Sequence, residues 1–185
     1  HTEALSDAGF EIKPLFPMVP GRLSHINTID VHEDEKLQED PAVQRDLALT
    51  WSEALPDGNK ILEGLWLQDG ENKQDDPQVS IESRLAQRLG VQLNDELSFE
   101  VAGTSFKVRV SSIRSVDWGT LSPNFYMILS PEVLQDLPVN YLTSFHVNAG
   151  SERQLTQLIR TFPTITLLDM SMVFEQIQSL LKQVS

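Results

Sequence analysis

Apolar and polar residues alternate with the two-residue period of a half-buried β-strand in the middle of the chain. This alternation covers residues 97–101 and 106–110, and the small residues of segment 102–105 are typical of a hairpin turn. The phase of the alternation slips before Ile113. The pattern therefore predicts two antiparallel strands, with a β-bulge near residues 111–112 of the second strand.

Further extended segments are expected on both sides of this hairpin. They are residues 10–15, 23–31, 47–51, 61–67, 125–129, 141–147 and 164–168. A turn at residues 56–59 separates two of them. Three prolines and a glycine within residues 14–21 predict a break in regular structure between the first two.

The helix with the strongest sequence signals covers residues 80–90. Ser80 is expected to cap its N-terminus, and Gly90 is suited to the left-handed residue that ends a helix. Ile81, Leu85 and Leu89 share one face at helical spacing. This segment is therefore expected to be an amphipathic helix packed on the sheet.

The two ends of the chain also carry helical patterns. Residues 2–8 resemble the end of a helix that closes at Gly9. Near the other end, a helix beginning at Ser151 and ending at Pro163 lies between two expected strands, which predicts a β-α-β unit with parallel strands. The terminal segments are therefore expected to pair into one α/β subdomain, with the middle of the chain inserted in it.

A last apolar stripe recurs at three- and four-residue spacing up to the end of the chain. Its members are Met170, Val173, Phe174, Ile177, Leu180, Leu181 and Val184. We expect the stripe to pack against the N-terminal helix, with the chain being a soluble portion of a longer protein. An ordinary C-terminal helix packed on its own core is the alternative.

Composition narrows the possible functions. The chain has 185 residues, enough for one domain or two small subdomains, and a formal net charge of −13. An excess of Asp and Glu argues against binding to nucleic acid or to an anionic membrane surface, because both reward clustered Lys and Arg. The chain has no cysteine, which excludes disulfides and thiolate metal sites within it.

The sequence offers few candidates for chemistry. It has no recognisable catalytic motif, no phosphate-binding glycine loop and no histidine spacing typical of a metal site, so no catalytic, cofactor-binding or metal residue is predicted. The acidic segments 32–46 and 68–77 are expected to be solvated loops. Arg114 is expected to form an ion pair with Asp117.

Aromatic side chains are the remaining candidates for binding. Trp66, Trp118 and Phe125 are candidates for a partner or substrate surface. A tryptophan in a strand-rich lobe equally suits a core position, so burial decides between the two.

Several segments taken together resemble a known family. They are 59–66 (NKILEGLW), the helix at 80–90, 94–99 (NDELSF), 113–118 (IRSVDW) and 123–126 (PNFY), supported by 19–23 (VPGRL) and 141–146 (YLTSFH). In order and spacing they are similar to the extracytoplasmic domain of FtsX/MacB-like ABC transporter permeases, above all the YbbP-type members. The resemblance covers nearly the whole chain.

This resemblance implies an α+β fold with a discontinuous α/β porter subdomain (βαβ-type) and an inserted β-rich sabre-like subdomain. The porter part would comprise residues 1–46 and 138–185, and the inserted part residues 47–137. It implies a periplasmic location in a bacterial inner-membrane protein, a stalk formed by the terminal helices, and ATP hydrolysis on a separate cytoplasmic subunit. The domain would move without catalysing a reaction and would handle a lipophilic substrate.

Two alternatives remain open at this point. The first is an interaction module that recruits or regulates a periplasmic enzyme, such as an esterase, a lipase or a cell-wall hydrolase. The second is a free-standing hydrolase, which would require a buried nucleophile and a base within hydrogen-bonding reach.

Overall fold

The computed structural model describes residues 15–67, 77–120, 122–134, 137, 139–143, 145, 147 and 150–167. The chain divides into two compact units. One is Pro14–Thr143, and the other combines His1–Lys13 with Ser144–Ser185. The sequence-based boundaries at 46/47 and 137/138 both fall within the larger unit, and the pairing of Val19 with Leu49 joins residues from the two sides of the first boundary.

The described residues form a mixed α and β structure in which strands predominate. The strands are β1 (Phe16–Ile26), β2 (Ile29–Asp30), β3 (Leu47–Trp51), β4 (Asn59–Gly64), β5 (Gln78–Glu82), β6 (Glu96–Val101), β7 (Thr104–Val116), β8 (Met127–Leu129) and β9 (Asn140–Leu142). The helices are α2 (Pro41–Gln44), α3 (Ser83–Leu89), the 3₁₀ turn η1 (Pro131–Val133) and α4 (Glu152–Thr161).

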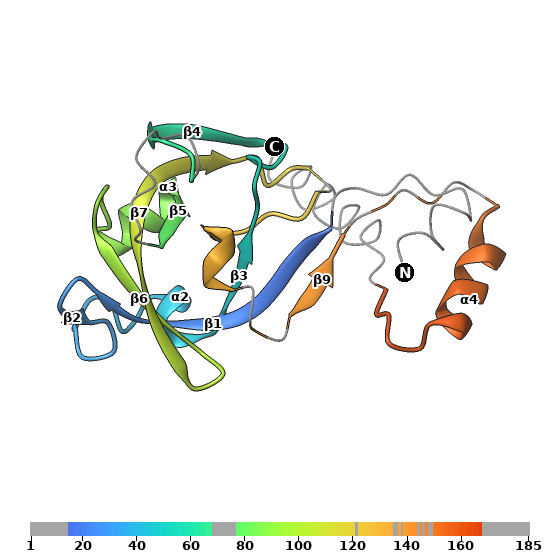
Figure 1. Ribbon diagram of the computed structural model, residues 1–185, viewed down its shortest axis with the longest axis horizontal. Coiled ribbons are helices and arrows are strands. Elements are labelled where there is room, and N and C mark those ends of the chain that lie inside the picture. Colours follow the sequence, from blue (N-terminus) through green and yellow to red (C-terminus); the bar gives the residue numbers. More distant parts are fainter. Residues whose placement is uncertain are drawn as a thin grey trace, which may run out of the picture. The chain divides into compact units, whose positions relative to one another are not determined.

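Six strands of the larger unit close into a ring (Figure 1). The order is β1, β3, β8, β5, β7 and β6, and β6 pairs again with β1. The neighbours β3 and β8 are parallel, as are β5 and β7, while the other neighbours are antiparallel. Closing the ring leaves none of these six strands without a neighbour on either side, and only β2, β4 and β9 extend beyond it among the described residues.

The predicted break at residues 14–21 is wrong from Phe16 onward, because β1 runs unbroken from there through Gly21. Pro17 is opposite Tyr141 of β9, and Pro20 is opposite Ala48 of β3. At each proline β1 pairs with one described strand only, so the missing N–H does not interrupt ladders on both sides. Gly21 is needed for packing, since a Cβ there would lie 2.3 Å from Leu49 Cδ1.

The expected helix at 80–90 is found, but it begins three residues later. Ser80 belongs to β5, and the N-cap is Glu82, whose Oε2 accepts a hydrogen bond of 2.8 Å from Leu85 N. Gly90 ends the helix with φ 69°, as predicted. The face carrying Leu85 is buried beside β5 and β7. Ser80 has the chemistry of an N-cap, but it lies in β5 and not at the start of the helix, because it pairs with β7 on one side and β8 on the other.

The central hairpin and its bulge are confirmed. Strands β6 and β7 pair from Val101 opposite Thr104 to Glu96 opposite Arg109, so the turn consists of two residues. Val79 is opposite Val110 and Ser80 is opposite Ser112, which leaves Ser111 as the extra residue of a bulge.

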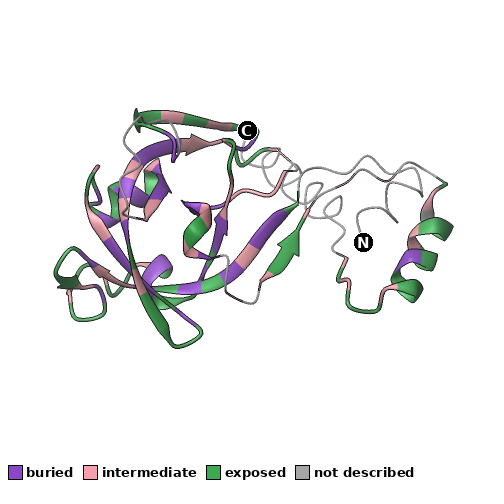
Figure 2. Ribbon diagram, in the orientation of Figure 1, coloured by how far each residue is buried: buried purple, intermediate pink, exposed green. Residues whose placement is uncertain are grey.

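The apolar side chains form two clusters. The larger one fills the inside of the ring with residues such as Leu23, Phe99 and Leu129. The smaller one consists of Phe16, Trp66, Leu67, Phe125 and Ile128. Met127 and Leu129 belong to the larger cluster and Ile128 to the smaller, because successive residues of a strand point to opposite faces. Figure 2 shows that β4 and β9, by contrast, are largely exposed.

Only one element of the second unit is described. Helix α4 agrees with the helix expected after Ser151, and Leu158 is its buried residue. The prediction of a strand at 164–168 is wrong for the residues that the structure describes, because none of residues 164–167 belongs to a strand. The expected N-terminal helix, residues 10–14 of the strand expected at 10–15, and the apolar stripe at 170–184 lie outside the described residues; Leu15, the last residue of that expected strand, is not in a strand.

Candidate functional site

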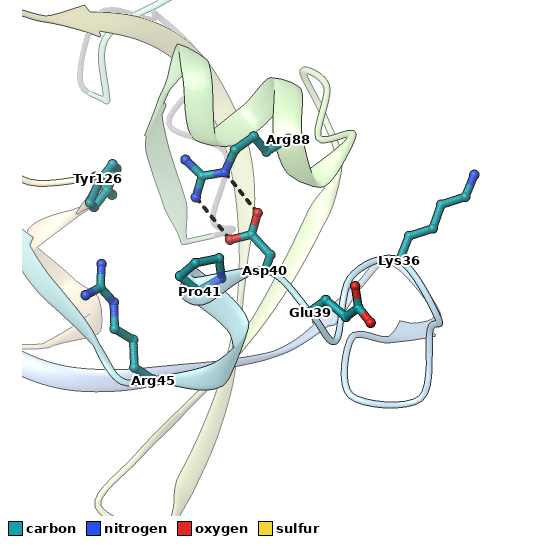
Figure 3. A pocket seen from close by; sticks show the side chains of 7 residues that line it. All are labelled: Lys36, Glu39, Asp40, Pro41, Arg45, Arg88 and Tyr126. Atoms are coloured by element: carbon teal, nitrogen blue, oxygen red, sulfur yellow. Dashed lines mark hydrogen bonds and ion pairs between the residues drawn. The ribbon is translucent and has the colours of Figure 1, made fainter.

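A shallow cleft of about 580 Å³ lies on the larger unit (Figure 3). Its lining residues are Lys36, Glu39, Asp40, Pro41, Arg45, Arg88 and Tyr126. They come from α2 and the loop before it, from α3 and from the residue before β8. Five of the seven are charged, so the cleft suits polar or ionic ligands better than apolar ones.

An ion pair between Arg88 and Asp40 forms the centre of the cleft. Arg88 Nε donates to Asp40 Oδ2 over 2.9 Å, and Arg88 Nη2 donates to Asp40 Oδ1 over 3.0 Å. Asp40 also caps α2, because Oδ1 accepts a hydrogen bond of 2.9 Å from Ala42 N. One carboxylate thus fixes the start of α2 and the direction of the Arg88 side chain at once.

The pKa values of the two partners shift as this geometry requires. The hydrogen bond from Arg88 lowers the pKa of Asp40 below its ordinary value, and the bond from Ala42 N adds to this. The same pair raises the pKa of Arg88. Since the Arg88 side chain is 46% exposed, water screens much of this attraction.

The other lining residues with polar side chains lie on two sides of this ion pair. Figure 3 shows Lys36 and Glu39 on one side, and Arg45 and Tyr126 on the other, with the Arg45 guanidinium directed toward Tyr126. Within the described part of the chain Arg45 forms no ion pair. Arg45 and Lys36 are therefore the two cations of the cleft without an ion pair among the described residues, and Arg45 is the one on the side of Tyr126.

An aromatic pair continues the cleft at Tyr126. The rings of Trp118 and Tyr126 have centroids 4.9 Å apart, at an interplanar angle of 47°. Trp118 is 43% exposed, although it lies in a loop with many internal hydrogen bonds. Tyr126 thus joins a charged cleft to an exposed indole.

Hydrogen bonds fix the loop that carries Trp118. Asp117 N donates to Gly58 O over 2.8 Å, and the Asp117 carboxylate accepts from Gly119 N over 2.9 Å. The amide of Asn124 donates to Asp117 O and to Thr120 Oγ1. Both ends of the loop are therefore tied to each other and to the turn before β4.

A buried arginine supports the same loop from the interior. Arg114 is fully buried; its Nη1 donates to Asn59 Oδ1 over 3.0 Å, and its Nη2 donates to Phe125 O. Its Nε has no hydrogen-bond partner among the described residues. Burial lowers the pKa of Arg114 to about 10, against the opposing effect of Glu82. The expected Arg114–Asp117 ion pair is wrong. Arg114 donates instead to the backbone carbonyl of Phe125, and the Asp117 carboxylate accepts from the backbone N–H of Gly119.

The three aromatic residues predicted to form a binding surface are not alike. Trp66 and Phe125 belong to the smaller core cluster, with exposed fractions of 8% and 3%, and Trp66 Nε1 donates to Glu53 O. Trp118 is the exposed member. The predicted stalk residues, Met170, Val173, Phe174, Ile177, Leu180, Leu181 and Val184, lie outside the described residues.

Sequence reasoning did not select Asp40, Arg45, Arg88 or Tyr126. Asp40 and Arg88 are 48 positions apart in the chain, and no spacing rule joins them. Asp40 lies in the acidic segment expected to be a solvated loop; it is instead mostly covered and bonded. An Asp directly before Pro41 is a helix-start signal that could have identified its capping role.

The described residues contain no group of three or more His, Asp or Glu side chains that could hold a metal ion. None of their helices combines the length and the apolar composition needed to cross a membrane.

Comparison with known proteins identifies a relative. The chain is 40% identical over 162 residues to the protein of Escherichia coli (strain K12) named "Uncharacterized ABC transporter permease YbbP". The match includes 88% of this chain and 19% of the relative, so the chain spans about a fifth of that protein's length. The resemblance to YbbP-type permeases is confirmed. No protein-family model matches the chain.

Proposed function

We propose that this chain is the periplasmic part of an FtsX/MacB-like ABC transporter permease of a bacterial inner membrane. The observation that carries the proposal is the 40% identity, which extends over 88% of the chain, to an ABC transporter permease. Such similarity over almost the full length applies to the whole fold rather than to one motif. A role connected with transport is the function that follows most directly.

The division of the chain supports a porter-and-sabre arrangement. The unit formed by His1–Lys13 and Ser144–Ser185 would be the porter-like part, and Pro14–Thr143 the inserted, β-rich part. Because both terminal segments belong to one unit, a movement applied to the two ends of the chain would act on that unit first. The closed ring of strands suits this role, since every strand in it is paired on both sides.

In this proposal the chain transmits movement and makes or breaks no bonds. ATP would be hydrolysed by a separate cytoplasmic subunit, and the apolar stripe from Met170 to Val184 would be the stalk that carries the movement outward. The substrate would be lipophilic. No residue of this chain needs a catalytic role in such a cycle.

Location is tested in the full-length protein by labelling of single cysteines. The 185 residues contain no cysteine, and Glu63 is exposed on β4. In a cysteine-free version of the full-length protein, Glu63→Cys should react with a membrane-impermeant maleimide on cells with a permeable outer membrane. Labelling that requires lysis of the inner membrane would place the chain in the cytoplasm and contradict the proposal.

Coupling is tested at the stalk. In the full permease with its ATPase subunit, Phe174→Asn or Ile177→Asn should leave ATP turnover in place and abolish its effect on transport, because a polar group would weaken helix packing. A substitution on the opposite side of the predicted helix, Ser179→Asn, is the matched control. Normal coupling in Phe174→Asn would count against the mechanical role.

The cleft favours a second function, an interaction module that recruits or regulates a periplasmic enzyme. Its lining is mostly charged and it lies beside an exposed tryptophan, which suits a protein partner better than a lipophilic molecule. This function does not exclude the first, because a moving domain can also hold a partner. Loss of the partner enzyme's activation in a variant that still transports would separate the two.

A further inference from the structure

We propose that Trp118, Tyr126, Arg88 and Arg45 form a docking surface for an acidic segment of a partner protein. The segment would place an Asp or Glu carboxylate between the two arginines and an apolar side chain on Trp118. This inference rests on the second proposed function, the interaction role, and does not require the first.

Charge is the first argument for an acidic partner. In a chain of net charge −13, the Arg88–Asp40 pair is internally neutral, while the lining of the cleft as a whole carries three positive and two negative side chains. Arg45 remains without an anionic partner among the described residues. An incoming carboxylate would meet this charge and also the Arg88 Nη1, which donates no hydrogen bond to any described residue.

The aromatic pair is an independent argument for a protein partner. Trp, Tyr and Arg are the residue types that contribute most often to binding energy at protein interfaces. Trp118 is 43% exposed although its loop is ordered, and its ring lies 4.9 Å from Tyr126, which lines the cleft. Covering the exposed part of this indole with an apolar side chain of a partner would contribute favourably to binding.

The loop holds this surface ready for binding. Arg114 binds the Phe125 carbonyl from inside, and Tyr126 O accepts a hydrogen bond of 2.9 Å from Glu82 N of β5. Asn59 Nδ2 also donates to Asn124 Oδ1 over 3.3 Å. A surface fixed by such bonds loses little conformational entropy on binding, which raises the affinity for a short segment.

The test is a selection of binding peptides on the full-length protein in detergent. A library of random dodecapeptides is displayed on phage, selected on the immobilised protein, and the enriched peptides are synthesised with a fluorescent label. We expect enriched sequences with Asp or Glu next to an apolar residue, in spite of the repulsion that the acidic chain exerts on such peptides in general.

Variants then locate the binding site. Trp118→Ala should weaken binding of the enriched peptides by about 30-fold or more, as for an interface hot spot. Arg45→Gln should weaken it by about tenfold, and replacing the peptide's acidic residue by Gln should have the same effect. Lys107→Gln removes the same charge from an exposed side chain that does not line the cleft, and should change binding by less than about twofold.

Three outcomes of the peptide experiments would overturn the inference. They are failure to enrich acidic peptides, equal binding to Arg45→Gln and the parent protein, and binding that Trp118→Ala leaves unchanged. A separate binding experiment replaces the peptides with vesicles of phosphatidylglycerol and phosphatidylcholine. If vesicle binding, and not peptide binding, depends on Arg45, the surface faces a membrane and the proposal is wrong. Cysteine labelling and ATP coupling are measured separately, so failure here is distinguishable from failure of the transport role.

Discussion

The Nη2 of Arg114 donates to the backbone carbonyl of Phe125, which joins the interior of the sheet to the loop that presents Trp118. The same guanidinium reaches Asn59 Oδ1 with Nη1. A buried side chain on β7 thus determines the conformation of a surface segment. Since both acceptors lose their donor together, the loop and the start of β4 should respond as one unit to a change at position 114.

Arg114→Met is expected to destabilise the chain by about 3 kcal/mol, because the buried Phe125 carbonyl and the part-buried Asn59 Oδ1 each lose a hydrogen bond. Arg114→Lys should recover only part of this loss, since one ammonium group does not have the fork geometry to reach both acceptors. Urea unfolding measures the stability, and amide exchange of residues 117–126 measures the loop. A loss below about 1 kcal/mol for Arg114→Met would contradict the supporting role.

Asp40→Asn separates charge from capping, because Asn remains a good N-cap. We expect a loss of up to about 1 kcal/mol at neutral pH, the scale of a half-exposed pair, and a further loss of about 1 kcal/mol for Asp40→Ala. Asp46→Asn is the control. Asp46 pairs with Arg22 at 3.2 Å, but both side chains are more than half exposed, so its effect should be near zero.

The same pair predicts a pH dependence. Since the folded-state pKa of Asp40 is below the ordinary aspartate pKa of about 3.9, the folded chain binds fewer protons at this site than the unfolded chain near pH 4. The contribution of Asp40 to stability is therefore complete above about pH 4 to 5 and is lost as the pH falls through the folded pKa. The difference in unfolding free energy between the parent and Asp40→Asn should therefore shrink as the pH is lowered from about 5 through the folded-state pKa of Asp40. A constant difference down to pH 2.5 would contradict the assignment.

Gly64→Ala should be far more damaging than Gly90→Ala. Both glycines have positive φ, 79° and 69°. A Cβ at Gly64 would also lie 2.1 Å from the backbone oxygen of Ser111, whereas a Cβ at Gly90 would enter open space among the described residues. We expect a loss of about 1 kcal/mol at Gly90 and clearly more at Gly64, measured by thermal unfolding.

Ala102→Asn should stabilise the hairpin between β6 and β7. Ala102 has φ 49°, a left-handed conformation that costs an ordinary L-residue roughly 1 kcal/mol, and Gly103 follows with φ 80°. Asn-Gly is the preferred pair for such a two-residue turn. We expect a gain of about 0.5 kcal/mol or more for Ala102→Asn and a loss for Ala102→Val, by urea unfolding.

Trp66→Ala and Trp118→Ala should differ strongly in stability. Trp66 is 8% exposed in the smaller core cluster, so its loss should cost about 3–5 kcal/mol. Trp118 is 43% exposed, so its loss should cost much less, about 1 kcal/mol. Equal costs would mean that Trp118 has a structural role, and would remove one argument for the docking surface.

Local patterns were sufficient for the elements whose physics is local. The hairpin of β6 and β7, the bulge at Ser111 and the left-handed Gly90 follow from alternation, a phase slip and a cap residue. The prolines of β1 were misleading. A strand can contain a proline where it pairs with a neighbour on one side only, and the sequence does not show which side is paired. Likewise, Ser80 has a cap's chemistry but lies between two strands that only the fold brings together.

The amino-acid sequence by itself determined the α+β composition, the acidic character, the absence of cysteine and the similarity to a permease. These properties depend on which residue types are present and on their order along the chain, and both are the same in the unfolded chain. Only the tertiary structure decided that Asp40 reaches Arg88, that Arg114 serves the Trp118 loop rather than Asp117, and that Trp66 and Phe125 are covered while Trp118 is exposed. The reason is physical: these hydrogen bonds join residues 11 positions (Arg114 and Phe125) to 48 positions (Asp40 and Arg88) apart, and they depend on the closure of the ring of strands, which no local pattern encodes.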